Sequence, residues 1–359
     1  MRIAIVPAQI APIREPQIGG AQVIVADLAR GLAQRGHEVA VFAPRGSHIE
    51  GVHVVDTGVD SDDLRPTRSR AGVTTNDARA TEAFRRVFKL VGEGTWDCIH
   101  NHAFDAPAIT EASTQKCAVV HTLHLPPDPL VAAAIAGAAP TNPAVIAVSV
   151  ASAVAWARVT RVHAVIRNGV PVARIPWSRS PGRGLLFVGR IAPEKGVDFA
   201  IETAAREGTR LTLIGGAYDE EWASEVMAGA DARTAAFLPP MSRESAWQEM
   251  AQAAALIAPS RWEEPFGLSA AEAQASGTPV IATRRGALPE IVRNGETGFI
   301  VDDIGAAVYA AARVAHIDRA ACRRHAETVL DIEPMLTAYE RLYEEKCEAG
   351  VAASSARSR

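Results

Sequence analysis

The amino-acid sequence predicts an α/β protein built from two doubly wound domains, each with a largely parallel sheet. Three observations predict this. Short apolar runs alternate with amphipathic helical stretches, the same series begins again in the second half, and a stretch without periodicity separates the two series. The 359 residues leave room for two domains of ordinary size. We expect the functional loops at the carboxyl ends of the strands, in a cleft between the domains.

The first domain is expected to cover residues 1–170. Its apolar runs are continuous, as in strands buried on both faces of a parallel sheet. A helix is expected at 20–35, and the strands at 3–7, 38–42, 97–101, 117–122, 144–148 and 162–167. The apolar stretch 130–139 is too short to cross a bilayer, which takes about 20 apolar residues, and we interpret it as a helix or lid.

The second domain is expected at 185–330, after a linker at 171–184 that is rich in Pro, Arg, Ser and Gly. Segment 331–348 should form a final helix packed on the first domain, because an apolar stripe runs along it, and the small, polar tail 349–359 should be disordered. The expected strands are 185–188, 211–214, 235–238, 254–258, 280–283 and 298–301, with helices at 194–206, 220–228 and 268–276.

Composition excludes several function classes. The 37 basic and 41 acidic side chains give a net charge of −4, which provides no overall attraction to nucleic acid or anionic lipid. The four cysteines show no metal-binding spacing and fit reduced thiols. No leader pattern stands at the N-terminus. We therefore expect a cytoplasmic protein without a nucleic-acid partner or stable membrane insertion, and leave its oligomeric state open.

The strongest local signal is PSRWEEPFGLSAAEAQASGTPVIAT, residues 259–283, which predicts a strand end, a loop, a helix and another strand. Pro265 is expected at the entrance of the helix. The amides of Phe266, Gly267 and Leu268 then lack intrahelical acceptors. A helix start with free N–H groups is a phosphate-binding site.

Two carboxylates flank this helix start. Glu264 lies in the loop before the helix, and Glu272 lies about one turn inside it. A carboxylate accepts two hydrogen bonds from a vicinal diol, so Glu272 suits a ribose and Glu264 suits hydroxyls of a transferred sugar. The alternative is that both are solvated acids that the helix dipole favours.

The second signal is FVGRIAPEKG, residues 187–196, after the first strand of the second domain. Arg190 and Lys195 can stabilise the negative charge that develops on a departing diphosphate. The alternative is that Lys195 merely begins a surface helix. We also assign to donor binding three residues at or next to strand ends, namely Gly189, Gly215 and Leu238.

A glycine pair follows the first strand and precedes the first helix. Gly19 and Gly20 would let the backbone approach a phosphate or sugar closely. A structural helix entrance is the alternative interpretation. The pair does not match GxGxxG, and no P-loop occurs.

Histidines end two consecutive strands of the first domain, in CIHNHAF and VVHTLH. Alternation places His100 and His102 on the same face. A metal site is one interpretation, but no acidic residue stands at a suitable spacing. Sugar-hydroxyl binding or proton handling is preferred, with His102 as the candidate, and we assign no metal.

These motifs resemble those of the retaining glycosyltransferases of family 4, which have the GT-B fold of two Rossmann-like domains with a cleft between them. The similar pieces run in the family's order from about residue 19 to 298. The last piece, 259–283, is the most specific. The resemblance implies a metal-independent transferase that keeps the anomeric configuration, with a UDP- or GDP-sugar as donor substrate and no cofactor.

The resemblance also implies residue roles. Arg190 and Lys195 would hold the donor diphosphate, and Glu272 would hold the ribose. Glu264, with the amides of Phe266 and Gly267, would orient the sugar and its phosphate. His102 matches the histidine beside the sugar, and Gly20 matches the loop near the phosphate or acceptor. The acceptor would be a small molecule, an oligosaccharide or a natural product.

Other interpretations stay open. Segment 238–243, LPPMSR, departs from the family by a double proline, which leaves the nucleobase open, and loops 60–75 and 126–143 indicate no acceptor. Asp60-Ser61-Asp62 formally supplies the DxD of a metal-dependent transferase. A nucleotide-sugar epimerase of similar architecture and a non-catalytic nucleotide-sugar binder are the remaining alternatives. The Ala- and Arg-rich usage is compatible with an actinomycete-like source, in which such enzymes decorate antibiotics or build mannosides.

Overall fold

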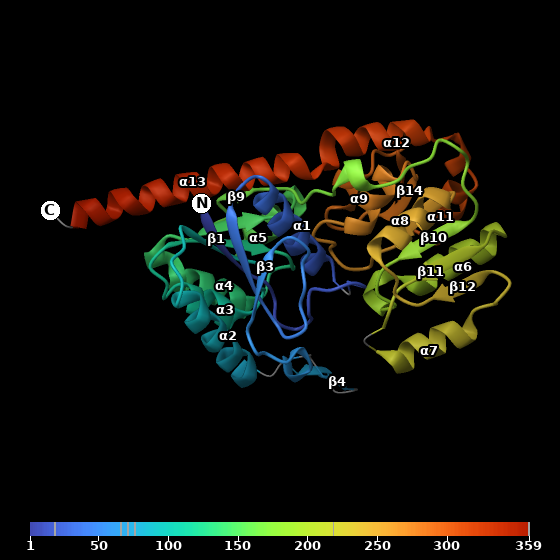
Figure 1. The fold of residues 1–359 in the computed structure, drawn as a ribbon. Helices are drawn as coiled ribbons and strands as arrows, with labels where there is room; N and C mark the ends of the chain where they lie inside the picture. Colours follow the sequence, from blue (N-terminus) through green and yellow to red (C-terminus); the bar gives the residue numbers. More distant parts are fainter. Residues whose placement is uncertain (18, 65–66, 70–71, 75–76, 218, 358–359) are drawn as a thin grey trace. The chain divides into compact units, whose positions relative to one another are not determined.

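The structure is a computed structural model that describes residues 1–357 except 18, 65–66, 70–71, 75–76 and 218. It divides into two compact units. The first comprises Met1–Arg14, Gly19–Arg167 and Pro334–Arg359, and the second comprises Glu15–Ile18 and Asn168–Glu333. Each unit is built around its own parallel sheet (Figure 1).

The sheet of the first unit has the strand order β3-β2-β1-β6-β7-β8-β9, and all neighbouring strands are parallel. The order reverses between β1 and β6, so the loops after these two strands flank a topological switch point. The strands are β1 (Arg2–Val6), β2 (Glu38–Ala43), β3 (His53–Asp56), β6 (Cys98–Asn101), β7 (Ala118–Leu123), β8 (Ala144–Ala147) and β9 (Ala164–Val165).

Helices cover both faces of this sheet. On one face Phe84, Val87 and Phe88 of α2 pack with Ile99 of β6 in a buried apolar cluster. A separate antiparallel pair, β4 (Thr67–Ser69) and β5 (Gly72–Thr74), lies outside the sheet. The helices are α1 (Gly20–Gln34), α2 (Asp77–Gly92), α3 (Ala106–Ala112), α4 (Pro129–Ala138) and α5 (Val150–Trp156).

The final helix, α13 (Ile332–Arg357), packs on the first unit from Pro334 onward (Figure 1). Leu336 fills the space that a side chain at Gly31 of α1 would need. Glu340 pairs with Arg35 and, at 2.8 Å, with His37. The expectation of a disordered tail from 349 is corrected, because the helix continues to Arg357; 358 and 359 lie outside the described residues.

The sheet of the second unit has the order β12-β11-β10-β13-β14-β15, again all parallel. Its switch point lies between β10 and β13. The strands are β10 (Leu185–Val188), β11 (Leu211–Ile214), β12 (Ala235–Leu238), β13 (Ala255–Ala258), β14 (Val280–Thr283) and β15 (Gly298–Val301). The helices are α6 (Val197–Glu207), α7 (Glu220–Gly229), α8 (Arg243–Gln252), α9 (Leu268–Ala275), α10 (Leu288–Ile291), α11 (Ile304–Ala311) and α12 (Arg319–His325).

Segment 171–184, expected to be a linker, is packed into the second unit. Val172 and Ile175 are buried, and the N–H of Arg183 donates to the carbonyl of Gln252 at 2.9 Å. The Pro and Gly content indicated irregular backbone correctly, but it could not show that two apolar side chains fasten this backbone to the core. The chain changes units earlier, between Arg167 and Asn168.

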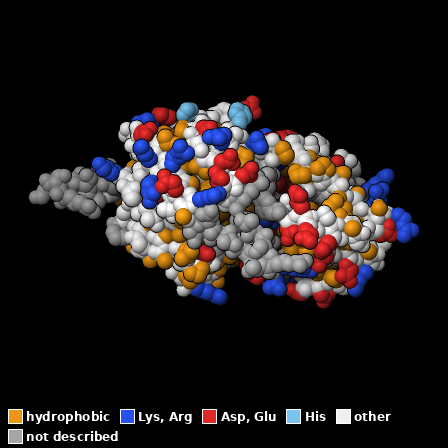
Figure 2. Space-filling model, turned by 90° about the horizontal axis from the view of Figure 1, so that it is seen from below, with side chains coloured by type: hydrophobic (Ala, Val, Ile, Leu, Met, Phe, Trp, Pro, Cys, Tyr) orange, Lys and Arg blue, Asp and Glu red, His pale blue; other side chains and the backbone are white. Residues whose placement is uncertain are grey.

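Charges of both signs and apolar side chains are interspersed on the face shown in Figure 2. This pattern agrees with the nearly balanced count of basic and acidic residues. Within the described part of the chain, no helix combines the length and the apolar character that a membrane span requires.

Candidate functional site

The loops after β10 and β13 lie next to each other at the switch point of the second unit. The N–H of Arg261 donates to the carbonyl of Glu194 at 2.8 Å, which ties the two loops together. Gly196 has φ +69°, and a Cβ there would come within 2.0 Å of the Pro259 carbonyl oxygen. Only glycine allows this approach. The helix expected from 194 begins as α6 at Val197, and Lys195 ends a short 3₁₀ turn, Pro193–Lys195, that precedes it.

Lys195 and Glu264, which the sequence places far apart, are in direct contact. The Lys195 Nζ lies 2.7 Å from Oε2 of Glu264. The Trp262 indole N–H donates to the same oxygen at 2.8 Å, and the Ser260 hydroxyl donates to it at 3.3 Å. The lysine ammonium also lies 4.9 Å from the centre of the Trp262 ring. Because both charged side chains keep some exposure, 20% for Lys195 and 15% for Glu264, a ligand can reach them.

The loop that carries Glu264 leads directly into α9. Gly267 precedes the helix with φ +98°, and no side chain caps the helix start. The expectation that Pro265 forms the helix entrance is therefore corrected. Gly267, in the left-handed region of backbone conformation, directly precedes the helix, which begins at Leu268. The Ala287 N–H donates to the Glu264 carbonyl at 2.8 Å and holds the loop. This geometry leaves helix-start N–H groups without a side-chain acceptor, which suits an anion.

Arg190 lies in the loop after β10 and forms an ion pair with Glu194 at 3.3 Å, among other interactions. Gly189 and Gly215 mark the ends of β10 and β11. A Cβ at Gly215 would approach the Gly189 carbonyl oxygen to 1.8 Å, so these two strand ends come very close. Leu238 ends β12 and is 37% exposed. These residues share the carboxyl edge of one sheet with Lys195 and Glu264.

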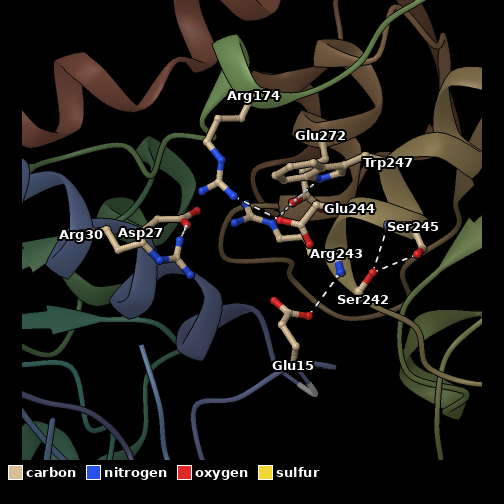
Figure 3. A network of polar contacts seen from close by, with 10 residues as sticks. All are labelled: Glu15, Asp27, Arg30, Arg174, Ser242, Arg243, Glu244, Ser245, Trp247 and Glu272. Atoms are coloured by element: carbon tan, nitrogen blue, oxygen red, sulfur yellow. Dashed lines mark hydrogen bonds and ion pairs between the residues drawn. The ribbon is translucent and has the colours of Figure 1, made fainter. Parts of the chain in front are cut away.

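Glu272 lies inside α9 and is buried, with its carboxylate held by α8 (Figure 3). The Trp247 indole N–H donates to Oε1 of Glu272 at 3.0 Å, and the Arg243 guanidinium pairs with the same oxygen. The guanidinium carbon of Arg243 also lies 4.8 Å from the centre of the Trp247 ring. The main-chain N–H of Arg243 donates to Glu15 at 3.2 Å. Trp247 and Arg243 thus both engage the same carboxylate oxygen of Glu272, Oε1.

The structure places Gly20 and His102 in the first unit, at that unit's own switch point. Gly20 is the first residue of α1, whose preceding residue Gly19 has no side chain to cap it. A Cβ at Gly19 would meet the Gln22 side chain at 2.4 Å. This contact is with the end of a flexible side chain, so it does not choose between the structural helix entrance and the ligand role that the sequence left open. A ligand role for Gly20 stays a prediction.

His102 is part of a buried hydrogen-bonded chain. Its Nδ1 lies 2.8 Å from Nε2 of His124, and its Nε2 lies 3.2 Å from Nδ1 of His100. Burial lowers the pKa of His100 and His102 well below the ordinary histidine value, and it lowers the pKa of His124 to about 4. These imidazoles are therefore neutral near pH 7. As placed, both ring nitrogens of His102 face other histidines.

Asp60 and Asp62 form a local turn. A carboxylate oxygen of Asp60 accepts the N–H of Asp62 at 3.1 Å, at the start of a 3₁₀ turn, Ser61–Leu64. Aspartate side chains in turns typically accept a hydrogen bond from the N–H group two residues further along the chain. In the part of the chain that the structure describes, no group of three or more His, Cys, Asp or Glu side chains is arranged to hold a metal ion. Loop 60–75 lies partly outside the described residues.

Sequence reasoning missed four partners of the predicted residues: Ser260, Trp262, Arg243 and Trp247. Trp262 stands two positions before Glu264, so its proximity was visible in the motif. Arg243 and Trp247 come from a different helix, α8, and reach Glu272 only through tertiary packing. No spacing rule connects them.

Two family models match the chain. "Glycosyltransferase Family 4" matches residues 18–174, and "Glycosyl transferases group 1" matches residues 178–317. The D-inositol 3-phosphate glycosyltransferase of Mycolicibacterium smegmatis is 30% identical over 364 residues, which cover 85% of this chain and 81% of the relative.

Solved structures show the same fold. Sucrose-phosphate synthase from Thermosynechococcus elongatus has a TM-score of 0.77 at 19% identity and covers 97% of this chain and 100% of that chain. Anabaena Alr3699/HepE in complex with UDP and glucose has a TM-score of 0.74 at 19% identity and covers 96% and 99%. The fold is thus the two-domain GT-B architecture of glycosyltransferases, with the final helix returning to the first domain. The chain belongs to glycosyltransferase family 4.

Proposed function

We propose that this protein transfers a glycosyl group from a nucleotide-diphosphate sugar to a hydroxyl acceptor with retention of the anomeric configuration. The observation that carries the proposal is the contact of Lys195 with Glu264 beside the start of α9. At one switch point, a cation and helix-start N–H groups suit the diphosphate of such a donor, and a carboxylate suits the hydroxyls of its sugar. That Alr3699/HepE was solved with UDP and glucose supports this choice of ligand class.

Lys195 would serve two anions at once. An ammonium group has three N–H donors, so Lys195 can keep its bond to Glu264 and donate to a phosphate oxygen. Arg190 would turn its guanidinium from Glu194 toward the diphosphate. The planar guanidinium group presents paired N–H donors that match phosphate oxygens. Both cations, with the amides of Phe266, Gly267 and Leu268, would stabilise the charge that develops as the bond from the sugar to the diphosphate breaks. This source of positive charge supports a metal-independent reaction.

The two carboxylates would hold the rest of the donor. Glu272 has one oxygen engaged by Trp247 and Arg243, and the other would accept a ribose hydroxyl. Glu264 would accept sugar hydroxyls, since a carboxylate offers several acceptor positions. The strand-end residues Gly189, Gly215 and Leu238 would border the nucleotide. In the first unit, we propose a donor-binding role for Gly20 and a catalytic role for His102.

Retention would follow from attack on the side from which the diphosphate leaves. The acceptor oxygen bonds to the anomeric carbon as the bond to the diphosphate oxygen breaks. The acceptor proton passes to the departing phosphate within the ion pair. Arg190 and Lys195 would hold that diphosphate in place long enough to receive the proton.

The test is a screen of UDP-, GDP-, ADP- and dTDP-sugars by thermal shift and by slow hydrolysis without acceptor. We expect one nucleotide class to raise the melting temperature and one sugar to be released as the α anomer from an α-linked donor, with the rate unchanged by EDTA. A β product would contradict retention, and loss of activity in EDTA would contradict metal independence. If no sugar nucleotide binds at millimolar concentration, the assignment of the donor site is wrong.

A further inference from the structure

The final helix, α13, carries a cysteine that reaches the amino edge of the first sheet. The Sγ of Cys347 lies 3.3 Å from the main-chain carbonyl oxygen of Asp97, the residue directly before Cys98 of β6. One turn earlier in the helix, the Tyr343 hydroxyl lies 2.6 Å from Nδ1 of His100, further along the same strand. The helix and the strand therefore run past each other in opposite directions.

The spacing along the two elements places Cys98 beneath Cys347. Two residues of a strand advance about 6.6 Å, and four residues of a helix advance about 6 Å. The step from His100 to Cys98 thus matches the turn of α13 that ends at Cys347. Strand side chains alternate between the two faces of a sheet, so Cys98 faces the same side as His100, which is the side that contacts α13. Ile99, between them, lies in the apolar cluster with α2 on the other face.

The electrostatic environment of these groups agrees with this placement. Burial raises the pKa of the Cys98 thiol well above its ordinary value, and charge on the Cys347 sulfur is the next cause. Burial, followed by charge on the Cys98 sulfur, raises the pKa of Tyr343. Cys98 therefore lies within electrostatic reach of both helix residues. Cys98 is buried, whereas Cys347 is only partly buried, so a small solute can reach Cys347 first.

Cys117, which stands directly before β7, has a different placement. Thr122 of β7 faces α13, since its hydroxyl lies 2.8 Å from the Tyr339 hydroxyl. Alternation along the strand then directs Cys117 to the opposite face, where it packs against the apolar cluster with α2. Cys117 therefore does not share the face on which Cys98 meets α13.

We propose that Cys98 and Cys347 form a reversible disulfide in the presence of hydrogen peroxide, and that this bond fastens the end of α13 to β6. The Cys347 thiolate attacks one peroxide oxygen, the O–O bond breaks, and a sulfenic acid and water result. The Cys98 thiolate then attacks the sulfenic sulfur, so that the S–S bond forms, the S–O bond breaks and the leaving hydroxide becomes water with a proton from the thiol. Two thiols are oxidised, and one hydrogen peroxide is reduced to two waters.

The bond would close a covalent ring that contains residues 168–333 of the second unit. A cross-link over so long a loop strongly restricts the unfolded chain, so the oxidised protein should be more stable. The Cys347 thiol would give up its contact with the Asp97 carbonyl. Burial raises the pKa of both thiols, which leaves few thiolates near neutral pH and keeps the pair reduced until the oxidant accumulates.

The first experiment identifies the pairing by peptide mass spectrometry of the full-length protein. Trypsin places the three cysteines of the first unit in different peptides, 90–116, 117–158 and 347–357. The protein is treated with hydrogen peroxide, and the remaining thiols are blocked with N-ethylmaleimide before digestion. We expect peptide 90–116 joined to peptide 347–357, with the mass of the two less two hydrogens. The number of free thiols, measured in denaturant, should fall by two.

Two variants locate the bond. Cys117→Ser is the matched control and should form the same cross-link as the wild type. Cys347→Ser should form none, and because Cys347 is only partly buried this variant should fold, which the melting temperature of the reduced protein checks. A cross-link between peptides 90–116 and 117–158, or a Cys347 that is oxidised only to sulfinic acid or only joined to a second copy of the chain, would overturn the proposal.

The second experiment compares melting temperatures of the oxidised and reduced protein. Oxidation should raise the melting temperature of the wild type by about 5 °C or more, and dithiothreitol should reverse the rise. Cys347→Ser should melt at the same temperature with and without peroxide treatment. A cross-linked wild type that melts no higher than the reduced protein would contradict the fastening of α13. Neither experiment uses a substrate, so both results stand whether or not the protein turns over a sugar nucleotide.

Discussion

The two sheets share one strand order, apart from the additional strand β9 of the first unit, but they carry different side chains at their switch points. In the second unit the switch point carries ionised side chains that keep some contact with solvent, with Lys195 and Glu264 in direct contact. In the first unit the equivalent position carries His100 and His102, which are buried and neutral. A parallel sheet thus supplies only the place for a site, and the burial of the loop residues decides whether charge or directed hydrogen bonding is available there.

The largest effect is expected for a substitution at the charged switch point of the second unit. Glu264→Gln should lower kcat by about 10²–10³, because the amide no longer pairs with Lys195 and presents a donor to the sugar. The measurement is steady-state turnover of the donor found in the screen. Glu296→Gln, an exposed glutamate of the same unit, should keep wild-type turnover. Wild-type kcat for Glu264→Gln would remove this residue from the site.

The buried histidines should make the stability of the protein fall in acid. Burial lowers the pKa of His121 and His124 to about 4, whereas an unfolded histidine titrates near pH 6.5. Between these values the unfolded chain binds more protons, so the free energy of unfolding should decrease by about 1.4 kcal/mol per pH unit for each residue as the pH falls. Urea unfolding at pH 7, 6 and 5 measures this slope.

A variant isolates the contribution of one imidazole to that slope. His121→Asn should lower stability at pH 7 but flatten its dependence on pH, because a titrating group is gone. His53→Asn, on an exposed histidine of β3, should keep the wild-type slope. Equal slopes for all three proteins would contradict the neutral state of buried His121.

Arg190→Ala should weaken the binding of UDP or GDP about tenfold or more, since a charged hydrogen bond contributes about 1.5–3 kcal/mol. Isothermal titration with the nucleotide alone measures this without any acceptor. Arg206→Ala is the matched control, because Arg206 also pairs with a glutamate four positions away, on the exposed face of α6. Equal affinities of wild type and Arg190→Ala would place the diphosphate elsewhere.

The smallest expected effect concerns the support of Glu272. Trp247→Phe keeps an aromatic side chain, although a smaller one, but removes the indole N–H that fixes the carboxylate, and should weaken nucleotide binding about fivefold, the equivalent of about 1 kcal/mol. kcat should change little, because the ribose is remote from the reacting bond. Trp222→Phe in α7 is the control. A fall in kcat without a change in affinity would show that Glu272 does not serve the ribose.

Much of the fold could be predicted because its signals are local. The strands 185–188, 211–214, 235–238, 280–283 and 298–301 have the expected bounds, since each is a continuous apolar run between breakers. Helix α2 and strand β3 were not predicted. The amphipathic pattern of α2 has many exposed charged residues, and β3 is only partly buried, so both give a weak apolar signal.

The sequence by itself determined the two sheets, the carboxyl edges that carry the motifs, and the glycine before α9, because backbone preferences and apolar periodicity act over a few residues. Only the tertiary structure decided which partners those motifs have. Lys195 meets Glu264 across 69 positions, and Tyr343 meets His100 across 243. Contacts over such distances depend on packing of whole elements, and the burial that packing creates is what makes the histidines neutral.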